Sequence, residues 1–148
     1  MTSSKRLLAL ALVLPLAGAA VVVAKTTGII PVPLKQIIPP PQRMCTARTA
    51  SGLGYRVLRS AAGARPAATA EVTVAYIGYL AATGEVFDQS DNAQFRANGV
   101  IDGFSEGLQM MPKGSVYRFC IPAKLGYGAD GAGPIPANAD LVFQVELK

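Results

Sequence analysis

The 148-residue sequence contains no histidine and only two cysteines, Cys45 and Cys120. Without imidazole, the chain cannot build a Ser/His/Asp or Cys/His catalytic group, or a zinc site that needs histidine. Two cysteines alone are too few for a thiolate metal cage. We therefore expect neither metal nor cofactor, and a function that needs no histidine proton relay.

Acidic residues are absent from the first 70 positions, which hold nine Lys or Arg. Residues 71–148 hold nine acidic and five basic residues, a formal charge of −4. An acidic folded region without a basic stripe is a poor partner for nucleic acid, so we expect no nucleic-acid binding. The basic excess between Lys25 and Arg65 suits an anionic membrane surface, although a solvated stretch is the favoured interpretation.

The N-terminus has the layout of an export signal. Lys5 and Arg6 precede the uncharged, largely apolar run 7–24, and a basic start followed by an apolar middle is typical of such signals. Two interpretations stay open. Cleavage after Ala19 or Ala24 would give a soluble periplasmic protein, whereas an uncleaved run, at the lower limit of length for a membrane span, would anchor the chain in the inner membrane.

The rest of the chain divides into a linker and one domain. Residues 25–49 are basic and proline-rich, which favours an extended linker, and residues 50–148 form the predicted domain. In an oxidising compartment Cys45 and Cys120 can pair as a disulfide. A buried, inert Cys120 with an exposed Cys45 is an equally good interpretation.

Within the domain, most stretches alternate apolar and polar residues, which predicts short antiparallel strands. A turn is expected at 81–85, and the predicted strands are 53–57, 71–80, a return from 86–87, 115–121 and 141–147. One segment has helical spacing instead, with its apolar residues at Val100, Ile101, Phe104, Leu108 and Met111. One short helix against one antiparallel sheet makes an α+β domain.

Four separated motifs carry a family resemblance: VAYIGYL at 74–80, GEVFDQS at 84–90, VIDGFSEGLQMM at 100–111 and LGYGADGAGPIPANADLVFQVEL at 125–147. In order and spacing they resemble the FKBP-type peptidyl-prolyl cis-trans isomerases, here an exported bacterial member. The resemblance implies a twisted antiparallel β-sheet half-wrapped around one short α-helix, with the active pocket between them.

The resemblance also implies the site residues. The expected catalytic set is Tyr76, Phe87, Asp88, Tyr127 and Phe143, and the expected substrate-binding set is Val100, Ile101, Phe104 and Ile135. Two positions depart from the family pattern. Phe104 stands where the family usually has tryptophan at the pocket floor, and Ala93 stands where another pocket aromatic often lies.

Such a pocket needs no nucleophile, because rotation about an X-Pro bond breaks no bond. Its barrier of about 18–20 kcal/mol reflects lost amide resonance, and a dry apolar pocket favours the twisted amide over the planar one. The resemblance implies isomerisation of proline-containing polypeptides, newly exported clients among them, and binding of macrolide inhibitors. The alternative function is a chaperone or binding module on the same fold.

Some bacterial relatives carry a long helical dimerisation arm before the domain. The corresponding stretch here is short and rich in proline, so we expect a monomer.

Overall fold

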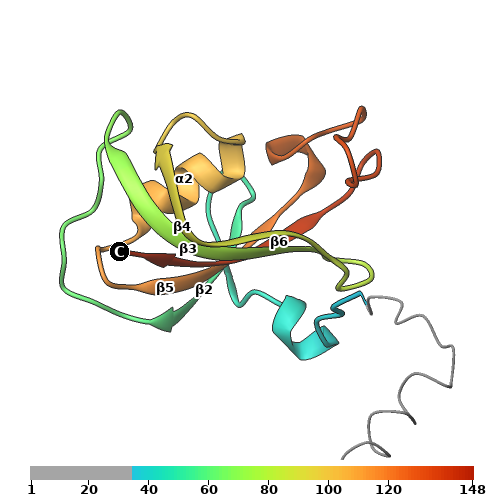
Figure 1. The fold of residues 1–148 in the computed structure, drawn as a ribbon, viewed down its shortest axis with the longest axis horizontal. Coiled ribbons are helices and arrows are strands. Elements are labelled where there is room, and N and C mark those ends of the chain that lie inside the picture. The colour runs from blue at the N-terminus through green and yellow to red at the C-terminus, as the bar shows by residue number, and fades with distance from the viewer. Residues whose placement is uncertain (1–34) are drawn as a thin grey trace, which may run out of the picture. The chain divides into compact units, whose positions relative to one another are not determined.

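A computed structural model describes residues 35–148, which form one six-stranded sheet and one α-helix within that range (Figure 1). The strand order is β1-β2-β5-β6-β3-β4, and every neighbouring pair is antiparallel. The strands are β1 (Ala47–Arg48), β2 (Gly54–Arg59), β3 (Glu71–Leu80), β4 (Val86–Arg96), β5 (Val116–Ile121) and β6 (Leu141–Leu147); the helices are η1 (Pro40–Arg43), α2 (Asp102–Met110) and η2 (Ala123–Leu125).

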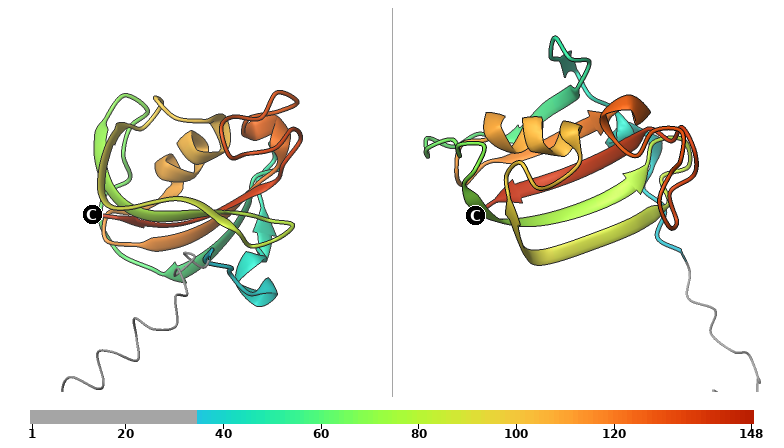
Figure 2. Two further views of the ribbon diagram at one scale, coloured as in Figure 1. Left: turned by 45° about the vertical axis from the view of Figure 1, so that its right-hand side comes forward. Right: turned by 90° about the horizontal axis from the view of Figure 1, so that it is seen from above.

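The core lies between α2 and the concave face of the sheet, which curves around the helix (Figure 2). Alternation along β5 sends Phe119 and Ile121 to this face, and the helix contributes Phe104 and Leu108. The helix packs closely on β5: a Cβ at Gly107 would lie 2.7 Å from the Phe119 ring. The predicted α+β class, with a twisted antiparallel sheet around one short helix, is confirmed within residues 35–148.

Two elements differ from the sequence-based expectation. The helix begins at Asp102, because Ile101 has extended backbone angles and occupies the N-cap position, so Val100 and Ile101 precede the helix. The strand expected from residue 86 continues to Arg96 as the edge strand of the sheet. Apolar periodicity did not predict the full length of β4, because the middle of the strand is polar and an edge strand outside the core need not alternate apolar side chains.

Residues 35–48 are not a free linker; they form a strap across the face of the sheet opposite α2 (Figures 1 and 2). At one end Ile37 pairs with Glu85, and at the other β1 pairs with β2. Between them the Tyr79 hydroxyl donates to the carbonyl oxygen of Gln42 at 2.6 Å. The compact unit therefore starts at Lys35, upstream of the expected boundary at residue 50.

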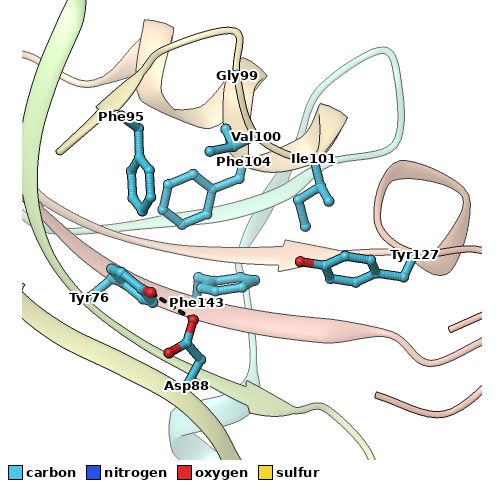
Figure 3. A pocket seen from close by; sticks show the side chains of 9 residues that line it. All are labelled: Tyr76, Asp88, Phe95, Gly99, Val100, Ile101, Phe104, Tyr127 and Phe143. Atoms are coloured by element: carbon cyan, nitrogen blue, oxygen red, sulfur yellow. Dashed lines mark hydrogen bonds between the residues drawn. The ribbon is translucent and has the colours of Figure 1, made fainter. Parts of the chain in front are cut away.

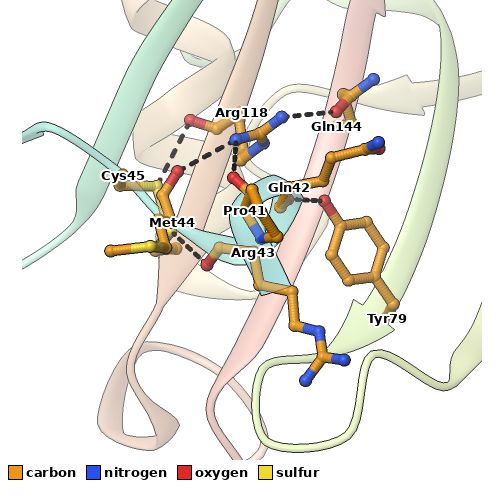
Figure 4. Close-up of a disulfide and its surroundings, with 9 residues drawn as sticks. Pro41, Gln42, Arg43, Met44, Cys45, Tyr79, Arg118 and Gln144 are labelled. Carbon is orange, nitrogen blue, oxygen red and sulfur yellow. Dashed lines mark hydrogen bonds between the residues drawn. A yellow bond between two sulfur atoms is a disulfide. The ribbon is translucent and has the colours of Figure 1, made fainter. Parts of the chain in front are cut away.

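The strap is joined covalently to the sheet by a disulfide between Cys45 and Cys120 (Figure 4). Of the two interpretations that the sequence left open, the structure has the bonded one. Beside it Arg118 is only 6% exposed and donates to the carbonyl oxygens of Met44 at 3.1 Å and Pro41 at 3.4 Å. A buried guanidinium and a disulfide thus fasten the same short segment.

The expected export segment, residues 1–24, lies outside the described residues, as does the first part of the expected linker, residues 25–34. Across residues 35–148, no helix has both the length and the apolar character that a membrane span needs.

Candidate active site

A cavity of about 360 Å³ opens between α2 and the sheet (Figure 3). Its walls come from strands β3, β4 and β6, from the segment before α2, from the first turn of α2 and from the loop after η2, so the fold brings together residues from six parts of the chain. The lining residues are Tyr76, Asp88, Phe95, Gly99, Val100, Ile101, Phe104, Tyr127 and Phe143.

Aromatic rings form the floor and one wall. Phe104, from the first turn of α2, meets Phe143 of β6 edge-on, with ring centroids 4.9 Å apart. The rings of Tyr76 and Phe95 lie 6.0 and 6.2 Å from Phe104 in similar edge contacts. Such edge-to-face packing holds each ring in a fixed orientation. The cavity is therefore a preformed apolar surface.

One polar pair sits at the rim. The Tyr76 hydroxyl donates a 2.7 Å hydrogen bond to Oδ2 of Asp88. Burial, with the hydrogen bond and negative charge of Asp88 as smaller causes, raises the pKa of the Tyr76 phenol above its ordinary value. Tyr76 therefore stays a neutral donor and orients the carboxylate.

Tyr127 faces this pair from the opposite side, with its hydroxyl pointing into the cavity (Figure 3). Its side chain is 39% exposed and its hydroxyl has no hydrogen-bond partner among the described residues. The flanking loop is held by backbone bonds, from Gly128 N–H to the Ala123 oxygen at 2.9 Å and from Asn138 N–H to the Gly128 oxygen at 2.8 Å. Tyr127 is thus a positioned donor whose hydroxyl bonds no acceptor within residues 35–148.

The cavity brings together seven of the nine residues that the sequence analysis nominated: Tyr76, Asp88, Val100, Ile101, Phe104, Tyr127 and Phe143. Phe87 does not line it but packs edge-on against Phe143, with centroids 5.5 Å apart, and so contacts the ring that forms the wall. Ile135 does not line it either; it is 7% exposed and belongs to the hydrophobic core.

Sequence reasoning missed Phe95 and Gly99. The aromatic expected at the position of Ala93 is supplied by Phe95, two residues further along the same strand. Asp88 and Phe95 differ by an odd number of positions yet line one cavity. The register between β3 and β4 shifts between Val74 and Tyr76, which changes the side-chain alternation of β4 between its two ends.

The side chains that line the cavity suit a reaction without covalent chemistry. No group of three or more potential metal-binding side chains occurs within residues 35–148. The cavity offers an apolar floor for a small ring, one free hydroxyl donor and one oriented carboxylate. These can bind and orient a peptide segment that carries an apolar ring.

The sequence profile of a family described as FKBP-type peptidyl-prolyl cis-trans isomerase matches residues 63–148. The chain belongs to this family.

Several relatives share this domain. The chain is 52% identical over 103 residues to the isomerase FkpA of Aeromonas hydrophila, an alignment covering 67% of this chain and 38% of the relative. It is 48% identical over 104 residues to the 22 kDa FKBP-type isomerase of Escherichia coli K12, covering 67% of this chain and 50% of the relative. This FKBP-type chain thus spans half or less of the length of these two curated relatives.

Solved structures agree on the fold. The crystal structure of FkpA from Escherichia coli matches with a TM-score of 0.66 and 39% identity, covering 68% of this chain and 49% of that one. The structure of AtFKBP13 matches with a TM-score of 0.63 and 29% identity, covering 68% and 94%. The sheet-and-helix arrangement of this FKBP-type chain is therefore shared with both.

Proposed function

We propose that this chain is a peptidyl-prolyl cis-trans isomerase that binds the rotating X-Pro bond in the cavity between α2 and the sheet. The observation that carries the proposal is the preformed aromatic floor of Phe104 and Phe143 facing the hydroxyl of Tyr127, which bonds no other described residue. Family membership supports the same reaction class.

The apolar cavity changes the relative free energies of the planar and the twisted amide. The planar amide has a charge-separated resonance form that water stabilises, whereas rotation decouples the nitrogen from the carbonyl and reduces that charge separation. A water-excluding cavity therefore favours the twisted state relative to the planar one. The prolyl ring rests on Phe104 and Phe143, with Val100 and Ile101 closing the cavity beside them.

Polar groups position the backbone on either side of the rotating bond. The Tyr127 hydroxyl donates to a substrate carbonyl oxygen, which fixes one side while the ring is held on the floor. Asp88, oriented by Tyr76, accepts a hydrogen bond from a substrate N–H at the rim. This mechanism transfers no proton, so a chain without histidine can carry it out.

Protease-coupled cleavage of a proline tetrapeptide tests the proposal. The protease cuts only the trans isomer, so an active isomerase speeds the slow phase of cleavage. Failure to exceed the uncatalysed rate would remove the enzyme claim. Suppression of client aggregation without such catalysis, surviving Tyr127→Phe and Asp88→Ala, would favour a chaperone or binding module instead.

Location and assembly belong to the same proposal. The substrates are proline-containing polypeptides outside the cytoplasm, where the signal or anchor at residues 1–24 directs the chain. The disulfide supports this location, because disulfides persist in oxidising compartments. One relative, 40% identical over 102 residues, is named outer membrane protein MIP of Legionella longbeachae. Mass spectrometry of the mature N-terminus distinguishes a cleaved signal from an anchor that associates the chain with the membrane.

Two further proposals concern partners. We infer a monomer, which a gel-filtration mass of twice the chain would contradict. We also infer that macrolide inhibitors of the family occupy the cavity. Displacement of a bound macrolide by a proline tetrapeptide tests this.

A further inference from the structure

The turn between β3 and β4 lies beside the strap (Figure 1). The Ile38 N–H donates to the carbonyl oxygen of Gly84 at 2.8 Å, and the Val86 N–H donates to the carbonyl oxygen of Gln36 at 3.1 Å. Asp88, which lines the cavity, follows Val86 by two residues on the same strand. The strap therefore bonds the stretch of chain that carries the rim carboxylate into the cavity.

One side chain of the strap holds the turn directly. The Arg43 guanidinium donates through Nε to the carbonyl oxygen of Ile38 at 2.7 Å and through Nη1 to that of Ala82, in the turn, at 2.9 Å. Gly84 has a φ of +77°, and a Cβ there would lie 2.6 Å from Arg43 Nε, so only glycine lets the strap approach this closely. Arg43 thus bridges the strap and the turn with two charge-assisted hydrogen bonds.

Arg43 is itself fixed, because its neighbours in the strap are bonded to the sheet. The Tyr79 hydroxyl donates to the carbonyl oxygen of Gln42 at 2.6 Å, and the buried Arg118 donates to that of Met44 at 3.1 Å. These bonds lie on both sides of Arg43 in the sequence. They are also independent of the disulfide, so the turn stays held when the disulfide is removed.

The stretch of β4 between the turn and the rim is irregular. Gly78 pairs with Asp88 and Tyr79 pairs with Val86, so within residues 35–148 no residue of β3 pairs with Phe87. An extra residue of this kind disrupts the local ladder and bends the strand. Because β4 is also an edge strand, its outer side here is bonded by the strap. The direction in which Asp88 points therefore depends on what holds the chain on the turn side of the bulge.

We propose that Arg43 is a positioning residue for the cavity: by holding the β3–β4 turn against the strap, it keeps Asp88 directed at a substrate N–H. The inference rests on the proposed isomerase function and deepens it. Arg43 lies outside residues 63–148, the part of the chain that the family profile matches. Asp88 bonds the substrate backbone in the planar and the twisted state alike, so a misplaced Asp88 weakens substrate binding without slowing the rotation step.

The first experiment is a double-mutant cycle on the KM for a proline tetrapeptide. Arg43→Ala should raise KM about two- to tenfold at unchanged kcat, the effect of one misplaced hydrogen bond. In the Asp88→Ala background the same substitution should change KM less than about twofold, because the residue that it positions is gone. In the Tyr127→Phe background it should keep its full effect. Equal effects in all three backgrounds, or no effect in the parent, would overturn the proposal.

The matched control is Arg56→Ala, which removes an exposed arginine on β2, at the other side of the sheet from β4. It should leave KM unchanged. A rise in KM equal to that of Arg43→Ala would show that the effect comes from lost positive charge and would overturn the positioning role.

The second experiment, amide hydrogen exchange by NMR, needs no substrate. The Val86 N–H is bonded to the strap, so its exchange should be at least about fivefold faster in Arg43→Ala than in the parent or in Arg56→Ala. Equal exchange in the three proteins would overturn the proposal that Arg43 holds the turn. Absence of catalysis by the parent would instead contradict the proposed isomerase function, while the exchange result would still decide whether Arg43 holds the turn.

Discussion

The Tyr76 hydroxyl donates to Oδ2 of Asp88 across the β3–β4 pair, and this 2.7 Å bond links the aromatic floor of the cavity to the one charged side chain that lines it among the described residues. Tyr76 also touches Phe104 and Phe143 through its ring. One side chain thus orients the carboxylate and supports the floor.

Tyr76→Phe should change how stability depends on alkaline pH. The pKa of Tyr76 is raised in the folded protein, so above about pH 10 the unfolded chain loses a phenolic proton that the folded chain retains. Stability contributed by the neutral phenol is therefore complete below pH 10 and is lost as the pH rises further. Denaturant titrations between pH 9 and 11 should give a shallower decline for Tyr76→Phe than for the parent. Parallel declines would contradict this; Tyr79, whose pKa is also raised, is common to both proteins.

Tyr127→Phe should reduce catalysis with little effect on folding. The lost hydroxyl removes one substrate hydrogen bond, worth about 0.5 to 1.5 kcal/mol, so kcat/KM should fall about two- to tenfold. The midpoint of urea unfolding should stay the same, because this hydroxyl bonds no other described residue. Tyr55→Phe on β2, away from the cavity, is the control and should keep full activity. Equal kcat/KM in both variants would exclude the role of Tyr127 as donor.

Gly78→Ala should disturb the cavity wall. A Cβ at this position would lie 2.6 Å from the Phe143 ring and 3.0 Å from Phe87, so both rings must move. Overpacking of this kind costs about 1 to 3 kcal/mol of stability, and the shifted Phe143 ring should also lower kcat/KM.

Gly107→Ala is the matched control, because its Cβ would crowd Phe119 in the core without touching the cavity lining. It should lose stability while keeping kcat/KM per folded molecule. An equal loss of kcat/KM in the two variants would show that Gly78 has no specific role at the wall.

Removing the disulfide should weaken the fold and leave the cavity intact. The bond joins residues 75 positions apart, and on the chain-entropy estimate a loop of this size contributes about 3 to 5 kcal/mol. The double variant Cys45→Ser with Cys120→Ser should therefore unfold at lower urea concentration. Its kcat/KM at low temperature should match the parent, because Cys120 faces away from α2. An unchanged unfolding midpoint would contradict the stabilising role.

Much of the fold could be predicted because its core strands alternate plainly. The boundaries of β3 and β6 match the expected 71–80 and 141–147. Apolar residues of both strands alternate into the hydrophobic core: Val72, Val74, Leu141, Phe143, Val145 and Leu147. The length of β4 could not be predicted, because its middle is polar and lies at the sheet edge. The strap was not predicted, because its prolines indicated an extended linker. Nor does any sequence pattern predict that a charged residue such as Arg118 will be buried beneath the strap.

The site was predicted better than the strap, because the family motifs carry most of it. Phe95 lines the cavity without having been expected there, and Ile135, expected to bind substrate, does not line it; the two differences have separate reasons. A bulge in β4 lets Asp88 and Phe95, seven positions apart, face one cavity, which strict alternation along the strand would not predict. Ile135 sits in a loop whose bridge to Ala132 turns its side chain into the core. Bulges and loop turns depend on tertiary packing that local spacing does not encode.

The most direct test of the account is the rate of cis-trans exchange in a proline tetrapeptide, measured by NMR with catalytic amounts of the parent chain and of Phe143→Ala. If the aromatic cavity favours the rotated amide, the parent should accelerate exchange well beyond the uncatalysed rate, and Phe143→Ala should lose most of that acceleration while remaining folded. Equal acceleration by both proteins, or none by the parent, would contradict the claim that this cavity catalyses the rotation.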